Sequence, residues 1–516
     1  MLKMVDDTGI IGVDMVCPLG GAVSPPQPPN YDNIEMEGVG SLMLPNSLKA
    51  PLERLESIGN STQSENPAPD NPQEIKSAGR KSKNLFDINY FKNKNNLQTI
   101  QCEGFALLGI TCNVKPNTNY TLSARLAEVK YNLNIANKGT RFSLTSSPAR
   151  TLMSNDDGTL CIGFYGVTAD KVNMDDFMKQ YKNIQLEEGN VASDYDPYGY
   201  LLDLKVTGKN LLSNKPADWQ IGKRISWSGY PEGAITIYPV IKNAVNVISL
   251  KPSTSYSIIN NSGGIVINRI VERGSSENGI KDHAVRSSKY TFVTNQNAMN
   301  AILQLKKVDG TELLSSDIES IKIMLVEGEV NDPTPYEPYT EQTVQIVLNE
   351  PLRGIGEYKD IISKDGVVRR IKRTVFDGSE DEKWGIGIER ENVIDFVSTQ
   401  FSDATKINEH QRSMMDKLKW SSGVWGRDEI GQDMFARILR INMPKTLAPD
   451  LQTFKTWLSQ NPLIVDYVLA EPVTELLPES VQAQLSSLHS ENGVTHVFVD
   501  SGEVPCGIKL TYRKEI

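Results

Sequence analysis

Four histidines are the side chains best suited to acid–base or metal chemistry, and they are scattered along the chain at His283, His410, His489 and His496. Only the last two lie close in sequence, and neither an HExxH motif nor a suitably spaced carboxylate accompanies them. We interpret all four as surface or packing residues. The sequence also lacks a GxSxG elbow, a P-loop and a GxGxxG motif between a strand and a helix.

Two groups of acidic residues are the other candidates for chemistry. A glycan hydrolase needs two carboxylates a few ångströms apart, but Glu187 and Glu188 are neighbours on a predicted strand and should point to opposite faces. The Asn-Asp-Asp-Gly segment at 155–158 offers oxygen ligands suited to calcium, yet it is also a typical hairpin turn, which we favour. We therefore predict a protein that is not an enzyme and that needs no cofactor or metal.

Sugar binding without catalysis requires only exposed aromatic faces, which stack on the sugar ring, and nearby amides, which bind its hydroxyl groups. Aromatic residues and asparagines of this kind cluster in the middle of the chain: Trp219, Trp227, Tyr230, Tyr238, Asn243 and Asn246. Serine, glycine and proline flank Trp227 and Tyr230, as is typical of a loop, whereas Trp219 is expected in the core. We predict a glycan-binding site at Trp227, Tyr230, Tyr238 and Asn243.

These residues belong to the second copy of an internal repeat. The matched segments are 83–86 with 209–212, 114–121 with 250–257, 184–189 with 323–328, and 195–198 with 336–339. In both copies a tyrosine, Tyr120 or Tyr256, follows the same Lys-Pro turn, and both copies close on a Tyr-x-Pro-Tyr motif. The spacing between the copies increases along the unit, which predicts loop insertions on a shared framework.

The pattern inside each copy is that of β-strands. Apolar, β-branched and aromatic residues fill strand-length runs at 159–165, 234–238 and 289–293. Asp-Gly pairs at 157–158 and 309–310 predict turns between such runs. We therefore predict two jelly-roll β-sandwiches with the same strand order, at residues 83–204 and 205–342.

The remaining segments complete a mainly β prediction. Residues 1–30 read as a docking peptide followed by a proline-rich linker, and residues 31–82 as an extended leader. Residues 343–516 predict a C-terminal β-rich domain with short helices. Its expected features are a hairpin at 365–366, helical spacing at 408–418, 451–458 and 478–488, and final strands at 495–499 and 507–512.

Composition excludes several classes of protein. The chain has 516 residues and a net charge of -10, whereas a dedicated nucleic-acid binder normally has a basic face. The densest basic run, at 369–373, is interleaved with valine and isoleucine, so we expect a solvated strand face. No apolar run reaches the roughly 20 residues that a spanning helix needs, which predicts no membrane insertion. Five cysteines without a CxxC pair should be free thiols, as suits assembly in a reducing cytoplasm.

Several of these motifs resemble one family. The leader segments 44–52 (LPNSLKAPL), 59–63 (GNSTQ) and 67–75 (PAPDNPQEI) resemble those of tail and baseplate proteins from phages and prophages of Gram-positive bacteria. The opening and closing motifs of the repeat are similar to the carbohydrate-binding-module-like jelly rolls of the same proteins. Residues 457–475 resemble their C-terminal module.

The resemblance implies a virion structural protein of the tail tip or baseplate, assembled in the host cytoplasm, that attaches to a glycan of the bacterial surface. It implies contacts with other tail or baseplate proteins, and closed symmetry makes a homotrimer the expected oligomer. The alternative is a purely architectural baseplate or capsid-fibre component without a ligand. If one domain holds the receptor, we expect the second, longer repeat to bind it through the loop with Trp227 and Tyr230.

Overall fold

The structure is a computed structural model, and its fold is mainly β, as predicted, with antiparallel pairing throughout the described strands. The described residues are 30–127, 130–227, 235–274, 278–285, 287–330, 335–399, 401, 403–404, 413–419, 431–435 and 437–516, with two short strands near the start of the chain, β1 (Lys3–Val5) and β2 (Ile11–Val13). Apart from those two paired strands, the predicted docking peptide and its proline linker lie outside the described residues.

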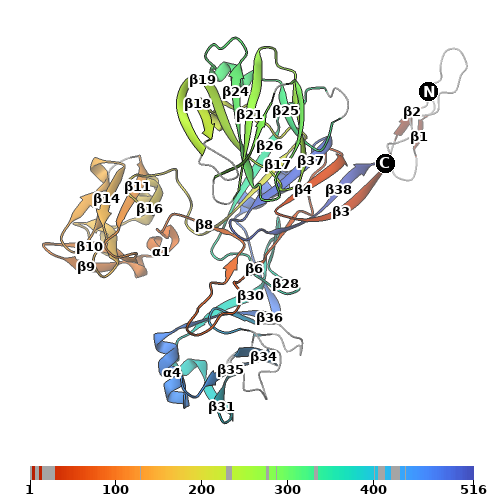
Figure 1. Ribbon diagram of the computed structural model, residues 1–516. Coiled ribbons are helices and arrows are strands. Elements are labelled where there is room, and N and C mark those ends of the chain that lie inside the picture. The colour runs from red at the N-terminus through yellow and green to blue at the C-terminus, as the bar shows by residue number, and fades with distance from the viewer. Residues whose placement is uncertain are drawn as a thin grey trace, which may run out of the picture.

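Strands from distant parts of the chain form one central sheet (Figure 1). In spatial order its strands are β26 (Glu341–Leu348), β17 (Tyr200–Thr207), β37 (Gly493–Asp500), β4 (Ser41–Ser47), β3 (Tyr31–Val39), β38 (Gly507–Glu515), β5 (Glu56–Ile58), β29 (Ile361–Ser363), β30 (Gly366–Phe376), β36 (Leu463–Glu475) and β33 (Ser413–Met415), and β8 (Arg80–Lys81) pairs with β17. The sheet therefore joins the two ends of the described chain.

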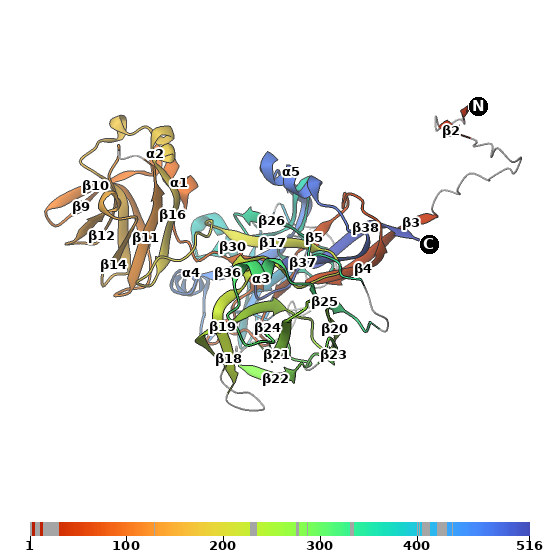
Figure 2. The same ribbon diagram turned by 90° about the horizontal axis from the view of Figure 1, so that it is seen from above.

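Three modules leave the central sheet and return to it at the ends of paired strands. Sandwich 1 (residues 85–188) lies between β8 and β17, sandwich 2 (residues 211–327) between β17 and β26, and the third module (residues 377–462) between β30 and β36. Paired antiparallel strands end side by side, so each module takes the place of a hairpin loop. Sandwich 1 projects away from the sheet, toward the end of the molecule opposite β3 and β38 (Figures 1 and 2).

The two sandwiches have the same strand order, which confirms that prediction. Sandwich 1 pairs a sheet of β13 (Arg141–Ser143), β12 (Leu133–Ala136), β15 (Thr159–Tyr165), β10 (Phe105–Asn113) and β9 (Gln98–Cys102) with one of β14 (Ala149–Met153), β11 (Asn119–Leu126) and β16 (Tyr181–Glu188). Sandwich 2 pairs β22 (Gly279–Ala284), β21 (Ile265–Arg273), β24 (Asn300–Lys307), β19 (Ile235–Ser249) and β18 (Gln220–Trp227) with β23 (Lys289–Val293), β20 (Ser255–Asn260) and β25 (Ile323–Glu327).

A buried asparagine explains why the repeat opens and closes with fixed motifs. In sandwich 1, Asn84 donates to the Ile184 carbonyl at 3.0 Å and accepts from the amides of Leu186 and Phe86 at 3.0 and 2.9 Å. Asn210 makes the equivalent three bonds in sandwich 2, at 2.9 to 3.4 Å. A buried amide is stable only when its polar atoms are paired, so this side chain fastens the first residue of each sandwich to its last strand.

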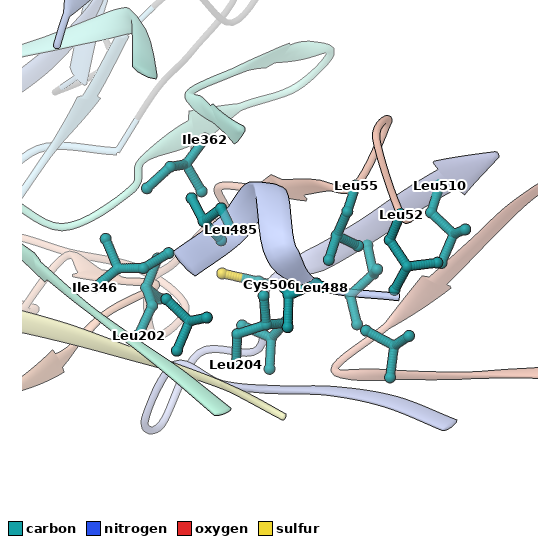
Figure 3. Close-up of a cluster of buried hydrophobic side chains, with 14 of the residues drawn as sticks. Leu52, Leu55, Leu202, Leu204, Ile346, Ile362, Leu485, Leu488, Cys506 and Leu510 are labelled. Atoms are coloured by element: carbon teal, nitrogen blue, oxygen red, sulfur yellow. The ribbon is translucent and has the colours of Figure 1, made fainter. Parts of the chain in front are cut away.

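The central sheet has one apolar face and one polar face. Side chains alternate along each strand, so Val206 and Val497 point to the apolar face and Thr207 and His496 to the other. Helix α5 (Glu479–Ser487) covers the apolar face with Leu485 (Figure 3). Leu485 belongs to a cluster of buried hydrophobic side chains on this face. The other members that Figure 3 labels are Leu52, Leu55, Leu202, Leu204, Ile346, Ile362, Leu488, Cys506 and Leu510.

The third module has its own small core. Its sheet contains β31 (Trp384–Glu389), β32 (Val393–Ser398), β35 (Ile438–Pro444) and β34 (Gly431–Phe435), and helix α4 (Leu451–Gln460) packs on it. The ring of Phe454 on α4 stacks on Phe396 at 4.1 Å, and Asp450 caps the helix by accepting from the Thr453 amide at 2.7 Å. Both predicted helices near residues 451 and 478 are therefore confirmed, in the form of α4 and α5.

Other short elements lie within these parts or between them. They are α1 (Ile88–Lys92), α2 (Met174–Gln180), α3 (Ser315–Glu319), the pair β6 (Ser61–Thr62) and β7 (Lys76–Ser77), and the pair β27 (Gly354–Ile355) and β28 (Tyr358–Lys359). The strands expected at 495–499 and 507–512 are present as β37 and β38, and the Asp-Gly hairpin at 365–366 joins β29 to β30.

The observed organisation differs from the predicted one in four places. The boundary predicted between residues 204 and 205 falls inside β17, a strand of the central sheet, so both sandwiches are shorter than predicted. Residues 31–82 are not an extended leader, because β3, β4, β5 and β8 are strands of the central sheet. Residues 343–516 are not a separate domain, since β26, β37 and β38 belong to that same sheet. The helix expected at 408–418 is replaced at Ser413–Met415 by β33, whose pairing with β36 outweighs a short helical spacing, and residues 408–412 lie outside the described residues.

Candidate ligand-binding sites

The four residues of the predicted glycan site belong to one hairpin of sandwich 2. Trp227 is the last residue of β18, Tyr238 and Asn243 lie on β19, and Tyr230 lies in the connection outside the described residues. Strand pairing places Trp227 opposite Ile235, in the last described pair of this hairpin. The side chains of Trp227 and Tyr238 lie outside the description, while Asn243 is half-buried. Trp219 is a core residue, as expected, and is 5% exposed.

The hairpin bends over the open face of the larger sheet of sandwich 2. Its pairing register shifts between Ile221 and Lys223, and Pro239 follows on the opposite strand, as is common at a bulge. Beyond the bend, the amide of Ile225 donates to Oε1 of Gln304 on β24 at 2.7 Å. Ile225 also packs with buried aliphatic side chains of β19, β21 and β24. Residues 223–227 and 235–239 thus form an arm with its own small apolar base.

Of the three described histidines, two are buried and one is partly exposed. His283 lies inside sandwich 2, with Nε2 2.5 Å from Oε1 of the buried Glu272. His489 follows α5 and is partly exposed, and His410 lies outside the described residues. His496 is fully buried on β37, and neither ring nitrogen has a hydrogen-bond partner. Within the described residues, no group of three or more histidine, cysteine or acidic side chains is placed to hold a metal ion.

Burial makes His496 a strongly perturbed base. Its Nδ1 lies 3.6 Å from Oε2 of Glu327, too far for a hydrogen bond, and that carboxylate is already paired with the Lys251 ammonium at 2.9 Å. Desolvation, helped by the positive charge of Lys251, lowers the pKa of His496 to about 3. The neighbouring Thr207 hydroxyl, opposite His496 in the sheet, is also buried without a partner.

The acidic candidates have structural roles. Glu187 is buried and accepts from Gln185 and Ser193, whereas Glu188 is exposed and pairs with Lys115, so the two carboxylates point to opposite faces as predicted. The segment at 155–158 is a hairpin turn, closed by a 3.0 Å bond from the Gly158 amide to the Asn155 carbonyl. The ammonium of Lys138 lies 3.1 Å from both carboxylates of this turn.

The described cysteines are free thiols, as predicted, and Cys17 lies outside the described residues. Burial raises the pKa of Cys112 to about 12 and that of Cys161 and Cys506 to about 11. Thiols that hold their protons so strongly are poor nucleophiles at neutral pH.

A cleft of about 380 Å³ lies between sandwich 2 and the polar face of the central sheet. On the sheet side its walls are Lys205 of β17, Phe498 of β37 and Tyr339, which precedes β26. On the sandwich side they include Asp218 and Asn246. We call this space the junction cleft.

Charges in the junction cleft are closely matched. The carboxylate of Glu341 accepts a hydrogen bond from the Tyr339 hydroxyl and lies 3.2 Å from the ammonium groups of both Lys205 and Lys215. Burial works to raise the pKa of Glu341, but the Tyr339 hydrogen bond and the two ammonium groups outweigh it and hold the pKa below its usual value. Burial, with the adjacent carboxylate, raises the pKa of Tyr339 far above its usual value. The cleft therefore keeps fixed charges and a protonated phenol at neutral pH.

Sequence reasoning did not identify this cleft. Tyr339 was visible as the last residue of the Tyr-x-Pro-Tyr closing motif, and Asn246 was noted beside the aromatic cluster, but Phe498 and Lys205 lie far away in the chain. Only the strand pairing of β17 with β37, which sets Lys205 opposite Phe498, brings the walls together.

A second, larger cleft of about 910 Å³ lies where the β3–β4 turn approaches sandwich 2. Val39, Pro505 and Met299 contribute to its more apolar wall, and both Val39 and Met299 are well exposed.

The comparisons with known proteins do not assign a family. No protein-family model matches the chain, and no curated protein matches it. A solved structure of the infectious bursal disease virus VP2 subviral particle aligns over 97% of this chain and 85% of its own, at 8% identity and a TM-score of 0.11. The structure of the Gt strain of that virus aligns over the same shares at 8% identity and a TM-score of 0.10. Scores this low carry no argument about fold or function. Among the described helices, none is long and apolar enough to cross a membrane.

Proposed function

We propose that this chain is a structural protein of a tailed-phage particle, positioned at the tail tip or baseplate, that attaches to a glycan of the bacterial surface. The proposal takes other tail or baseplate proteins as its partners and a homotrimer as its assembly. It makes the protein a non-catalytic adhesin of the virion.

The observation that carries the proposal is the insertion of complete modules at hairpin positions of one central sheet. Two of the modules are copies of the same sandwich, and each begins and ends where β17 meets a paired neighbour. Such an arrangement holds several modules away from a common frame, and ligand-binding loops on rigid β-scaffolds are a frequent way to present recognition surfaces. It suits attachment and display better than catalysis, which needs converging reactive groups.

The arm of sandwich 2 supplies the chemistry that sugars require. Trp227 ends β18 beside the hairpin tip, and an aromatic face there would stack on the apolar side of a pyranose. The apolar base under the arm, formed by Ile225 and its neighbours, would support the end of β18.

One feature supports assembly with other chains. Strand β3 pairs with β38 along its whole length, but on its other side the only described partner strand is β4, at Val39 and Ser41. A long strand with an open edge is a template for pairing with a further chain. This edge would serve a trimer or a neighbouring baseplate protein, and it also favours the second candidate function, a purely architectural component without a ligand.

Binding of the purified full-length chain to a glycan array and to host cells tests the proposal. We expect the wild-type protein to bind both and the Trp227→Ala variant to bind about tenfold more weakly at an unchanged melting temperature, since stacking on a sugar is worth roughly 1–3 kcal/mol. Tyr90→Ala removes a 52% exposed aromatic side chain from sandwich 1 and is the matched control.

Two results would change the conclusion. A wild-type chain that binds neither glycans nor cells, while present in purified particles, would establish the architectural alternative. Full binding by a well-folded Trp227→Ala variant would remove the arm from the receptor site.

A further inference from the structure

We propose that the junction cleft between sandwich 2 and the central sheet binds a neutral saccharide unit. This would be a second ligand site, separate from the arm with Trp227. It rests on the proposed function in one respect, because a surface glycan is the source of the ligand.

The first argument is an unpartnered amide inside the cleft. Asn246 of β19 is 8% exposed and lines the cleft, yet its side chain makes no hydrogen bond in the structure. The other buried asparagines that close the sandwiches, Asn84 and Asn210, have all their bonds satisfied by backbone groups. The polar atoms of Asn246 are open to the cleft, where they can bind a ligand that both donates and accepts.

The second argument is the presence of aromatic walls. Phe498 is half-buried on β37, and the ring centroid of Tyr339 lies 5.7 Å from the ammonium groups of both Lys205 and Lys215. Aromatic surfaces beside hydroxyl-binding groups are the combination that sugar rings need, since a pyranose has an apolar side and a polar rim.

The third argument is charge balance, which selects a neutral ligand. The two lysines are offset by Glu341, which pairs with both, and by Asp218, which accepts from the Ser213 hydroxyl at 2.5 Å. An acidic sugar would meet these carboxylates and a cation would meet the ammonium groups, so neither gains a net attraction. Hydroxyl groups can donate to the carboxylates and accept from the lysines and Asn246.

The volume fits the same class. A cleft of about 380 Å³ lies at the lower end of the range of roughly 300–1,000 Å³ that small-molecule sites occupy, which suits one sugar ring or two. We therefore infer the recognition of one or two residues of a glycan rather than of an extended chain.

The test is saturation-transfer NMR of the full-length chain with glucose, galactose and N-acetylglucosamine, and with glucuronate as the charged control. We expect the wild type to bind at least one neutral sugar at millimolar concentration and to bind glucuronate more weakly. Asn246→Ala should weaken that binding about tenfold, the effect of one lost hydrogen-bonding group, at an unchanged melting temperature. Asn261→Ala, at an exposed residue of sandwich 2 that does not line the cleft, should leave it unchanged. Phe498→Leu provides a second cleft variant.

The outcomes separate this inference from the proposed function. The inference is overturned if no neutral sugar binds at about 20 mM, or if glucuronate binds more strongly than the neutral sugars. The proposed function is tested separately, by the glycan array. Binding that survives Asn246→Ala and Phe498→Leu but is lost in Trp227→Ala overturns the inference and supports the arm as the site.

Discussion

Replacing His496 by leucine should remove a specific part of the acid sensitivity of this protein. His496 is fully buried between the central sheet and sandwich 2, and both ring nitrogens lack partners. Burial lowers its pKa to about 3 from an ordinary value of 6.5. The folded state therefore binds no proton at this ring between these two values, whereas the unfolded chain does.

The sign and size follow from this difference. The unfolded state binds more protons below pH 6.5, so stability falls as the pH drops from 6.5 toward 3. Each pH unit within that window costs about 1.4 kcal/mol, so His496 alone should remove roughly 2 kcal/mol between pH 7.5 and pH 5. The expected loss of stability at pH 5 is the same for any pKa of His496 below about 4 in the folded state. Above that pH, only the unfolded chain binds a proton at this residue.

Urea unfolding of the wild type and of His496→Leu, followed by tryptophan fluorescence from pH 5 to 7.5, measures the effect. All other groups titrate in both proteins, so the difference between them isolates the histidine. We expect the variant to be more stable at every pH, because it loses two unpaired nitrogens, and its advantage to grow by roughly 2 kcal/mol on acidification. Parallel pH curves for the two proteins would refute the reasoning.

Three further substitutions test the packing. Asn84→Ala leaves a carbonyl and two amides without partners and should destabilise sandwich 1 by about 2–4 kcal/mol, seen as hydrogen exchange that accelerates in that module alone. Tyr256→Phe removes the hydroxyl that accepts from the Lys251 amide at 2.9 Å and should cost about 1–2 kcal/mol in thermal unfolding. Asp360→Ala removes one of the two carboxylates that pair with the buried Arg369 and leaves three backbone amides without their acceptor. It should cost about 3–5 kcal/mol in urea unfolding, and a loss below about 1 kcal/mol would contradict this bonding.

The sandwiches could be predicted because their signals are local. The runs at 159–165 and 289–293 are strands with those same bounds, β15 and β23. The repeated Lys-Pro turn places Tyr120 and Tyr256 alike, each with its hydroxyl accepting from the lysine amide five residues before it. Motifs of this kind contain their own hydrogen-bond partners, so the sequence alone is enough to recognise them.

The central sheet could not be predicted in the same way. Tyr31–Val39 alternates half-buried and exposed residues, but its partner β38 lies at the other end of the chain, and no local signal specifies such a pairing. Pairing between distant segments also explains why the prediction for the basic run at 369–373 was partly wrong. It is a strand, as expected, but Arg369 is buried and bonded to carboxylates and carbonyls of neighbouring segments rather than solvated.

The candidate sites, like the fold, could be predicted from the sequence only in part. The sequence predicts an aromatic site at Trp227 from the local composition around it, and that site stays a prediction. The sequence could not reveal the junction cleft, whose walls Lys205 and Phe498 meet only across β17 and β37.

Electron microscopy of particles purified from cells that express this chain, labelled with an antibody against sandwich 2, tests the central claim most directly. The account predicts label at the tail tip or baseplate, accessible from outside, and loss of attachment to host cells when the antibody is bound. Particles that lack the chain altogether, or that attach normally with the label in place, would contradict it.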